Sequence, residues 1–510
     1  MKLVKSLLLG SAAGLIAVGG AQAADLPVKA KAVEYVRICS LYGAGFYYIP
    51  GTDTCIKLGG YLRAEVALNT NSVYNGQFSG VGGAHNRLSN YYTMRSRQDL
   101  NIDTRTATEY GVVRTFFDAT FSWTTGGYAG AGAGLTGGTT AYDAAPPGTS
   151  GSGSVAGGAL GVYYAFIQFA GFTMGKAVSQ FSAPWTNYPG NNFDGLVGGG
   201  GTVTGVNQFT YTADFGQGIT AAISAQDQAQ YYQAGVINAS GITAAGILGG
   251  AYGVGDYGGS RMPDIVGMVR IDQAWGLFQL SAAAHENHVG YYGASEVTGH
   301  PDDKWGWAVQ AALSIKNIPT GAGDSINLQG VYTDGATRYN IQDLASVSYS
   351  MFGSSGLAGA YQSIGFASAP DTVFIAGGSQ ESIKTWGFRG AYTHNWDPYW
   401  NTAIYGAYAG IQYTGASKTF ICGSGAMAAA LTAGSTCDPD FNIAQLGLIT
   451  RWTPVKNLTF SADFTWTHLD QKYSGVAAYA GNAATAKPAA FYELKDQDSL
   501  NLLLRAQRNW

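Results

Sequence analysis

Three arginine residues in one stretch of the chain are separated by even numbers of residues. Arg95, Arg97 and Arg105 are separated by two and eight residues, and even spacing places side chains on one face of a β-strand. Guanidinium groups stay charged at physiological pH and bind or steer anionic groups. The pattern therefore indicates electrostatic chemistry rather than proton transfer. Further charges lie on the matching face of this predicted strand and of its neighbours, and these are Lys57, Arg63, Arg114, Asp99, Asp103 and Asp118.

Motifs for covalent or hydrolytic catalysis are missing from the sequence. His285 and His288 are neighbours, but a separation of three residues puts them on opposite faces of a strand. The chain has no G-x-S-x-G nucleophile elbow and no H-E-x-x-H motif. The other histidines are scattered, at His85, His300, His394 and His468. The sequence therefore predicts that the protein is not an enzyme and needs no cofactor.

The four cysteines fall into two local pairs. Cys39 with Cys55 and Cys422 with Cys437 are predicted to form disulfides, because an exported chain meets an oxidising compartment. The alternative is a metal site, but neither pair has close C-x-x-C spacing and no histidine lies beside them. The sequence therefore predicts two disulfides and no metal centre, and it predicts that Cys422–Cys437 closes a hairpin within the long link 413–441.

The elements that must position the charges are strands. Leu458, Phe460 and Ala462 alternate with Thr459 and Ser461, and the last eleven residues alternate in the same way up to a terminal tryptophan. One face of each such strand suits lipid and the other suits water. Sixteen candidate strands follow from these patterns, at 56–69, 92–108, 111–123, 158–170, 172–178, 207–215, 219–228, 264–272, 277–288, 305–316, 325–334, 383–394, 400–412, 442–452, 458–468 and 499–510.

The connections between these strands alternate in length. Links such as 109–110, 170–171 and 216–218 are short, whereas 124–157 and 335–382 are long and rich in Gly, Ser and Ala. A bacterial outer-membrane barrel has short periplasmic turns at one end and long extracellular loops at the other. The sequence therefore predicts an all-β fold, a sixteen-stranded antiparallel transmembrane β-barrel.

Composition and the N-terminus support export to a membrane. Charged residues make up only 12% of the chain, Gly accounts for 74 residues and Tyr for 33, which suits barrel strands and an aromatic girdle. Residues 1–23 read as a signal peptide, with two lysines, an apolar stretch and a small-residue cleavage site. Residues 24–55 form an N-terminal segment, and 56–510 the barrel. The acidic net charge of −4 argues against a nucleic-acid partner.

Several segments, in this order, resemble the general porins of alphaproteobacteria. They are Cys39–Cys55 followed by Ile56–Arg63, then Arg95-Ser-Arg97, Arg105–Gly111, Trp396-Asp-Pro398 and Trp452–Asn457. The resemblance covers nearly the whole mature chain. It implies a homotrimeric outer-membrane channel through which small hydrophilic solutes and ions diffuse passively, with membrane lipid around it. The long loops rich in Gly, Ala and Ser depart from the family.

The resemblance also implies that the third long loop, 179–206, folds into the lumen and narrows it. Asp194 is the only charged residue of that loop. We expect it to face a basic wall formed by Lys57, Arg63, Arg95, Arg97, Arg105 and Arg114, while Lys176 precedes the loop and shares its parity with Phe172 and Met174. Opposed charges across a constriction tune ion selectivity. Two alternatives remain, which are a substrate-specific channel with a saturable site and, less favoured, a barrel hydrolase.

Overall fold

The computed structural model describes residues 37–68, 83–87, 91–124, 159–185, 196–202, 205–227, 232–248, 252, 255–341, 347–481 and 486–510. The chain divides into two compact units, Met1–Ile56 and Lys57–Trp510. No helix within the described ranges is long and apolar enough to cross a membrane.

The first unit is held together by a disulfide. Its described part contains η1 (Ser40–Tyr42) and β1 (Tyr47–Tyr48), and β1 pairs antiparallel with Cys55 and Ile56. The Cys39–Cys55 bridge is the pairing expected from the sequence, and both cysteines are buried beside Phe46. The described residues of this unit bury only a small apolar cluster, and a disulfide adds stability where such a core is small.

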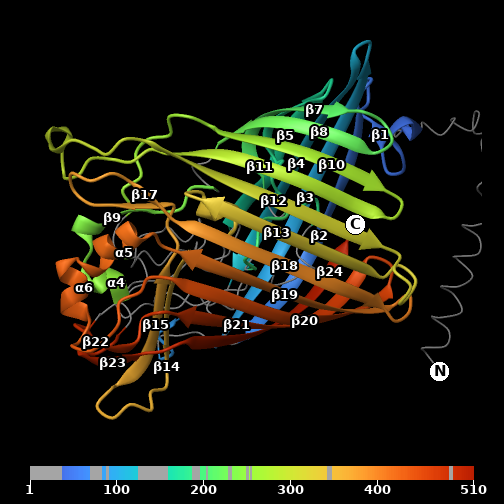
Figure 1. Cartoon of the computed structure of the whole chain (residues 1–510). Helices are drawn as coiled ribbons and strands as arrows, with labels where there is room; N and C mark the ends of the chain where they lie inside the picture. Colours follow the sequence, from blue (N-terminus) through green and yellow to red (C-terminus); the bar gives the residue numbers. More distant parts are fainter. Residues whose placement is uncertain are drawn as a thin grey trace, which may run out of the picture. The chain divides into compact units, whose positions relative to one another are not determined.

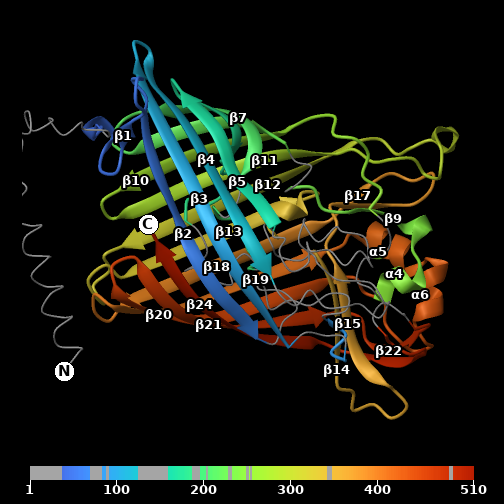
Figure 2. The same cartoon turned by 180° about the vertical axis from the view of Figure 1, so that it is seen from behind.

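The second unit is a closed antiparallel barrel of sixteen strands (Figures 1 and 2). Each strand pairs with the next along the chain, and the last pairs with the first in the register Tyr61↔Asn509 to Leu68↔Leu502. Among the described residues of the barrel, closure leaves no strand at an open edge of the sheet. The strands are β2 (Cys55–Leu68), β3 (Tyr92–Thr108), β4 (Gly111–Thr124), β5 (Ala159–Phe169), β6 (Phe172–Ala177), β7 (Val206–Asp214), β8 (Ile219–Gln226), β10 (Asp264–Gln273), β11 (Gly276–Asn287), β12 (Lys304–Lys316), β13 (Ser325–Asp334), β18 (Lys384–Asn395), β19 (Trp400–Gln412), β20 (Phe441–Val455), β21 (Leu458–Gln471) and β24 (Gln497–Asn509).

The strands alternate between the two faces of the barrel wall as their sequences predict. On β12, Trp307 and Val309 are 45% and 43% exposed, whereas Ala308 and Gln310 between them are 0% and 3% exposed. The exposed apolar residues Trp307 and Val309 point outward to lipid, and the buried residues Ala308 and Gln310 point into the lumen. The predicted strands are all present, with the largest differences of three residues at the ends of β20 and β21.

Short turns connect the strands at one end of the barrel. The turn between β5 and β6 consists of Ala170 and Gly171, with φ of 49° and 84°. Positive φ at both central positions is the two-residue hairpin geometry that matches strand twist. Asn317 and Asn457 take similar φ values, 55° and 67°, in two further turns of this end. These are residues that tolerate the left-handed region better than most.

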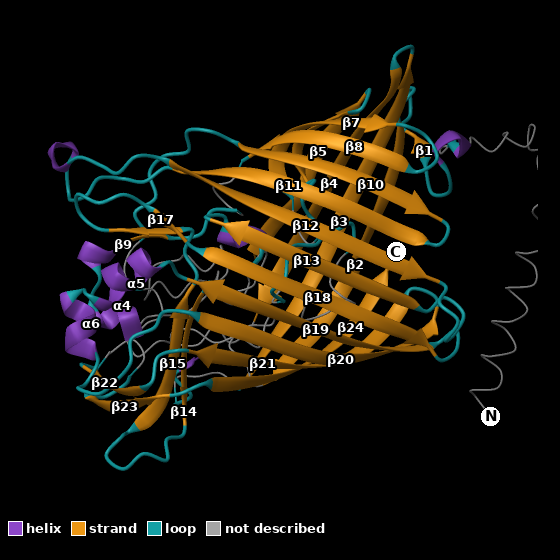
Figure 3. Cartoon of the chain, viewed as in Figure 1, coloured by secondary structure: helices purple, strands orange, loops and turns teal. Residues whose placement is uncertain are grey.

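The long loops contain secondary structure that the sequence patterns did not predict (Figure 3). One small sheet pairs β14 (Ser348–Gly353) and β15 (Gln362–Ser368) of the sixth loop with β22 (Gly475–Tyr479) and β23 (Ala490–Leu494) of the eighth. Another joins β9 (Val236–Asn238) with β16 (Thr372–Phe374) and β17 (Glu381–Ser382). These loops and α4 (Ala244–Leu248) share one apolar core with inward residues of β18–β21.

The second disulfide corrects one expectation. Cys422–Cys437 forms as predicted, but it does not close a hairpin. It joins the end of α5 (Gly415–Cys422) to the segment after α6 (Gly425–Ala430), because the seventh loop folds into two short helices. Thr414 and Ser424 cap these helices by accepting hydrogen bonds from the main-chain N–H groups of Ser417 and Met427.

Candidate functional site

The strand ends place the third loop at residues 178–205, and two arms of it are described, 178–185 and 196–202. The first arm lies on the inner face of the barrel. Gln279 of β11 donates to the carbonyl of Ser182 over 3.0 Å, and Gln310 of β12 donates to the carbonyl of Phe181 over 2.7 Å. The loop therefore enters the lumen, as expected.

The second arm continues along the same side of the wall. Gln329 of β13 donates to the carbonyl of Gly200 over 3.0 Å, and the main-chain N–H of Val197 donates to Gln445 of β20 over 2.9 Å. The two arms also bond to each other, through the N–H of Ala183 and the carbonyl of Gly200 at 3.2 Å. Together the arms follow the inner wall from β11 to β20.

The glycine run of the third loop is required by close packing. The N–H groups of Gly198 and Gly199 both donate to the carbonyl of Asn340, over 3.0 and 2.9 Å. A Cβ on Gly198 would lie 2.6 Å from the carbonyl carbon of Phe388, and one on Gly199 would lie 2.3 Å from Nε2 of Gln329. Both residues also have positive φ, 94° and 109°, so only glycine fits here without strain.

Three of the basic side chains expected on the wall, those of Arg95, Arg105 and Arg114, form ion pairs with carboxylates. Arg95 of β3 and Arg505 of β24 both contact Glu65 of β2, the latter over 2.7 Å between Nε and Oε2. The side chains of Glu65 and Arg95 are 0% and 1% exposed. A buried carboxylate between two guanidinium groups has its charge compensated and its lone pairs used.

Arg97 and Arg63 contact polar but uncharged groups. Arg97 donates to the hydroxyl of Ser122 over 2.8 Å and to that of Tyr163 over 2.7 Å. Arg63 donates to the amide oxygen of Gln507 over 2.8 Å. These hydrogen bonds to neutral acceptors fix the positions of the two guanidinium groups.

A third group lies near the short-turn end of β3 and β4. Asp103 accepts from Arg105 at 2.9 Å and from Arg114 at 3.1 Å, so one carboxylate serves two guanidinium groups. Arg114 also donates to Gln168 of β5 over 2.9 Å. The three charged side chains are only partly buried, and the pair of arginines leaves one positive charge in excess.

The remaining expected residues lie apart from this group. Lys57 is exposed where β2 leaves the short-turn end. Lys176 shares the parity of exposed Phe172 on β6, and its ammonium group donates to the carbonyl of Val162 over 2.6 Å. Asp194 lies outside the described residues.

Sequence reasoning missed several lumen arginines. Arg505 contacts Glu65, and Arg451 of β20 donates to Asn401 over 3.2 Å. Arg389 of β18 is 4% exposed and donates to Gln329 over 3.2 Å. The sequence did contain a signal for these three arginines, because each lies on the polar face of a strand with alternating polarity. What the sequence could not supply is the pairing of β24 with β2, which brings Arg505 to the others.

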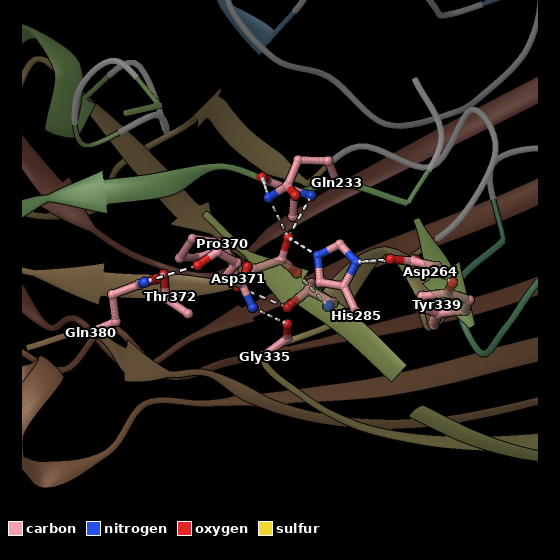
Figure 4. A network of polar contacts seen from close by, with 12 residues as sticks. Gln233, Asp264, His285, Gly335, Tyr339, Pro370, Asp371, Thr372 and Gln380 are labelled. Carbon is pink, nitrogen blue, oxygen red and sulfur yellow. Dashed lines mark hydrogen bonds and ion pairs between the residues drawn. The ribbon is translucent and has the colours of Figure 1, made fainter. Parts of the chain in front are cut away.

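A buried polar network lies at the long-loop end of β10 and β11 (Figure 4). Nδ1 of His285 lies 3.0 Å from Asp264, and its Nε2 lies 3.6 Å from Asp371 of the sixth loop. Asp264 also accepts from the hydroxyl of Tyr339, and Asp371 from the N–H of Thr337 over 2.6 Å. The network therefore fixes the sixth loop, whose Asn340 holds the third, to the barrel wall.

The same network bears on catalysis and metal binding. Both ring nitrogens of His285 face carboxylates, so neither is aimed at a hydroxyl or thiol nucleophile as a catalytic dyad requires. Across the described ranges, no group of three or more His, Cys, Asp or Glu side chains is arranged to hold a metal ion.

Comparison with solved structures shows a similar barrel fold in a known protein. The outer membrane channel DcaP of Acinetobacter baumannii matches with a TM-score of 0.55, covering 91% of this chain and 99% of that chain. The sequence identity is 13%, so the likeness concerns the fold.

The family follows from the sequence comparisons. A family model described as "Porin subfamily" matches residues 25–503. Porin Omp2b of Brucella suis biovar 1 (strain 1330) and of Brucella abortus (strain 2308) are each 31% identical over 337 residues, which cover 66% of this chain and 75% of theirs. The chain belongs to the porin family.

Membership confirms the main predictions from the sequence. The protein is a β-barrel of the Gram-negative outer membrane, and it forms a water-filled channel for passive diffusion of small hydrophilic solutes. The resemblance to alphaproteobacterial porins is confirmed by the Brucella relatives.

Proposed function

We propose that solutes cross this porin between the third loop and an arginine wall, which we define as Arg63, Arg95, Arg97, Arg105, Arg114 and Arg505. One observation carries the proposal. The described arms of the third loop bond to the inner faces of β11, β12, β13 and β20, whereas the arginine wall lies on β24, β2, β3 and β4. The described arms occupy one side of the lumen, and the proposed aqueous path follows the other.

The arginine wall gives this path a positive side. Glu65 and Asp103 each serve two arginines, so the wall holds more guanidinium than carboxylate groups at these two clusters. Asp194 supplies the only negative charge of the third loop, and we propose that it faces the wall. Charges opposed across a narrow, partly desolvated channel act more strongly than charges in open water. Lys57 contributes at the short-turn rim of the path, whereas Lys176 has the parity of exposed Phe172 and lies outside it.

The reversal potential of the channel in a planar bilayer under a salt gradient tests this route. If the path follows the arginine wall, Arg97→Ser moves the reversal potential toward cation preference. Lys316→Ser, which removes an exposed charge at the short-turn end, serves as the control. A shift of equal size in both variants would show that the wall does not line the path.

A second function has an observation in its favour. Three arginines of the wall lie over aromatic rings, with Arg63 4.4 Å from the ring centre of Tyr61 and Arg97 5.7 Å from that of Tyr163. Arg114 lies over Phe116 at 5.1 Å. A saturable, substrate-specific channel needs solute-binding groups along the pore, and cation–π contacts hold these three guanidinium groups in fixed positions. Blocking of single-channel current by low solute concentrations would favour that function, and linear permeation favours the general pore.

The remaining features complete the proposal. Transport is passive, without cofactor, metal or catalysis. The chain is exported with residues 1–23 as a signal peptide, followed by the segment 24–55 and the barrel 56–510, and it assembles as a homotrimer in outer-membrane lipid. The porin family supports oligomerisation and solute passage. N-terminal sequencing of the mature protein and cross-linking in the membrane test these two statements.

A further inference from the structure

Four glutamines on the inner wall share an unusual environment. They lie on β11, β12, β13 and β20, and each is almost completely buried, with exposures of 0%, 3%, 3% and 5% for Gln279, Gln310, Gln329 and Gln445. A buried amide needs partners for its donors and its acceptor. Each of the four makes at least one hydrogen bond with the main chain of the third loop, and Gln279 donates to three of its carbonyls.

The orientation of two of these amides is fixed by neighbours. Arg389 donates to Oε1 of Gln329 over 3.2 Å, and Nε2 of Gln329 in turn donates to Oε1 of Gln310 over 2.6 Å. Both oxygens are therefore occupied, so the NH₂ groups must face the loop carbonyls. This chain of bonds presents donors to Phe181 and Gly200 of the two arms.

The fourth glutamine has the opposite polarity. Oε1 of Gln445 accepts from the N–H of Val197 over 2.9 Å. Gln279 and Gln310 thus hold the first arm through donors. Gln329 holds Gly200 of the second arm through a donor, and Gln445 holds Val197 of the same arm through an acceptor. The barrel itself closes through main-chain pairing alone, so these side chains are not needed to form the wall.

We propose that Gln279, Gln310, Gln329 and Gln445, which we call the glutamine latch, position the third loop in the lumen and thereby set the size limit of the pore. The inference rests on the proposed function, because a size limit at the third loop presupposes that solutes pass beside it. The four residues are positioning residues, since they act on solutes only through the loop.

The opposite polarities provide a matched test. Gln→Glu removes the donor at Gln310 and at Gln329 and sets a carboxylate against a carbonyl, whereas Gln445→Glu keeps the acceptor for Val197. All three substitutions add the same charge to the same lumen. A change in ion selectivity caused by the added charge should therefore occur in all three variants. Release of the third loop should occur only in Gln310→Glu and Gln329→Glu.

The experiment is liposome swelling at pH 8 with arabinose, sucrose and raffinose. Relative to arabinose, raffinose entry should rise by about fivefold in Gln310→Glu and in Gln329→Glu, which is the effect of losing one net hydrogen bond on the population of released loop. Gln445→Glu should behave as the parent does. Equal raffinose entry in all three variants, or no increase in any, would overturn the proposal.

Two further measurements keep the outcome interpretable. A heat-modifiable band on a gel shows that each barrel is folded, and Gln310→Met, which also lacks the donor, replaces a Glu variant that fails to fold. Failure of the proposed route would appear separately, as a reversal potential that Arg97→Ser shifts no more than Lys316→Ser does. A parent that admits arabinose but not raffinose, with latch variants that do the same, would contradict the latch alone.

Discussion

Glu65 and Arg505 are directly paired across the seam that closes the barrel, and Nε of Arg505 donates to Oε2 of Glu65 over 2.7 Å. Arg95 contacts the other oxygen of the same carboxylate. The first, second and last strands of the barrel therefore meet at one buried acid. Main-chain pairing closes the ring, and this cluster fixes the charges of the wall at the closure point.

Removing that carboxylate should weaken the barrel. Glu65→Gln leaves two buried arginines without their counter-charge, which we expect to cost about 3 kcal/mol of stability. Asp272→Asn is the matched control, because its bridge to Lys316 is about half exposed and is worth less than about 1 kcal/mol. Urea unfolding in detergent micelles, followed by tryptophan fluorescence, measures both. Equal losses would mean that Glu65 does not stabilise the seam.

The selectivity of the pore should depend on arginines that contact neutral groups. Arg63 and Arg97 donate to Gln507, Ser122 and Tyr163. We expect Arg63→Ser and Arg97→Ser to raise conductance and favour cations, more strongly at 0.1 M than at 1 M salt, because the Debye length falls from ~10 to ~3 Å. Single-channel recording at both concentrations checks this. A shift that does not depend on salt would argue against an electrostatic cause.

A periplasmic turn should lose stability in acid. Burial would raise the pKa of the Asp324 carboxyl, but hydrogen bonds from the N–H of Asn395, from Thr320 and from His394 hold its pKa well below the usual range. A depressed pKa stabilises the fold above the unfolded value of about 4, and the benefit is lost as pH falls through the folded value. The difference in unfolding temperature between the parent and Asp324→Asn should therefore be largest near pH 7 and shrink below about pH 4. A difference that grows in acid would reverse this assignment.

The hydrogen bonds that fix the sixth loop should also affect how steadily the pore stays open. Asp371 accepts hydrogen bonds from the N–H groups of Ala234 and Thr337, over 2.7 and 2.6 Å, and faces His285. We expect Asp371→Ala to release the turn that carries Asn340 and to increase brief closures in single-channel records severalfold. Glu296→Ala, at an exposed acid of the fifth loop, should leave the records unchanged. If closures were equally frequent in both variants, the polar network around Asp371 would have no effect on the pore.

The sequence was sufficient for the barrel because alternation is a local property. Leu458, Phe460 and Ala462 indicate a lipid-facing side of their strand without information from any other strand. The alternation of short and long links indicates which end of the barrel carries the turns and which carries the loops. The lumen parity of Arg63, Arg95 and Arg97 could be read in the same way. Their partners could not, since Arg505 meets Glu65 only after the ring has closed.

The structure of the loops and the latch was beyond the reach of sequence patterns. β15 pairs in parallel with β23, which lies in a different loop more than a hundred residues away. Gln310 and Gln329 read as ordinary polar residues of a water-filled wall, because nothing local shows that a loop will cover them. The long loops rich in small residues lack the periodicity that would have indicated α5 and α6.

The central claim is that the third loop narrows the lumen, and liposome swelling of a loop deletion tests it most directly. Removing residues 191–200 takes away Asp194 and the glycines held by Asn340, while the strands β6 and β7 keep their lengths. We expect the deleted protein to admit raffinose at a rate close to that of arabinose, with the barrel still heat-modifiable. A folded deletion variant with the size limit of the parent would show that the constriction lies elsewhere.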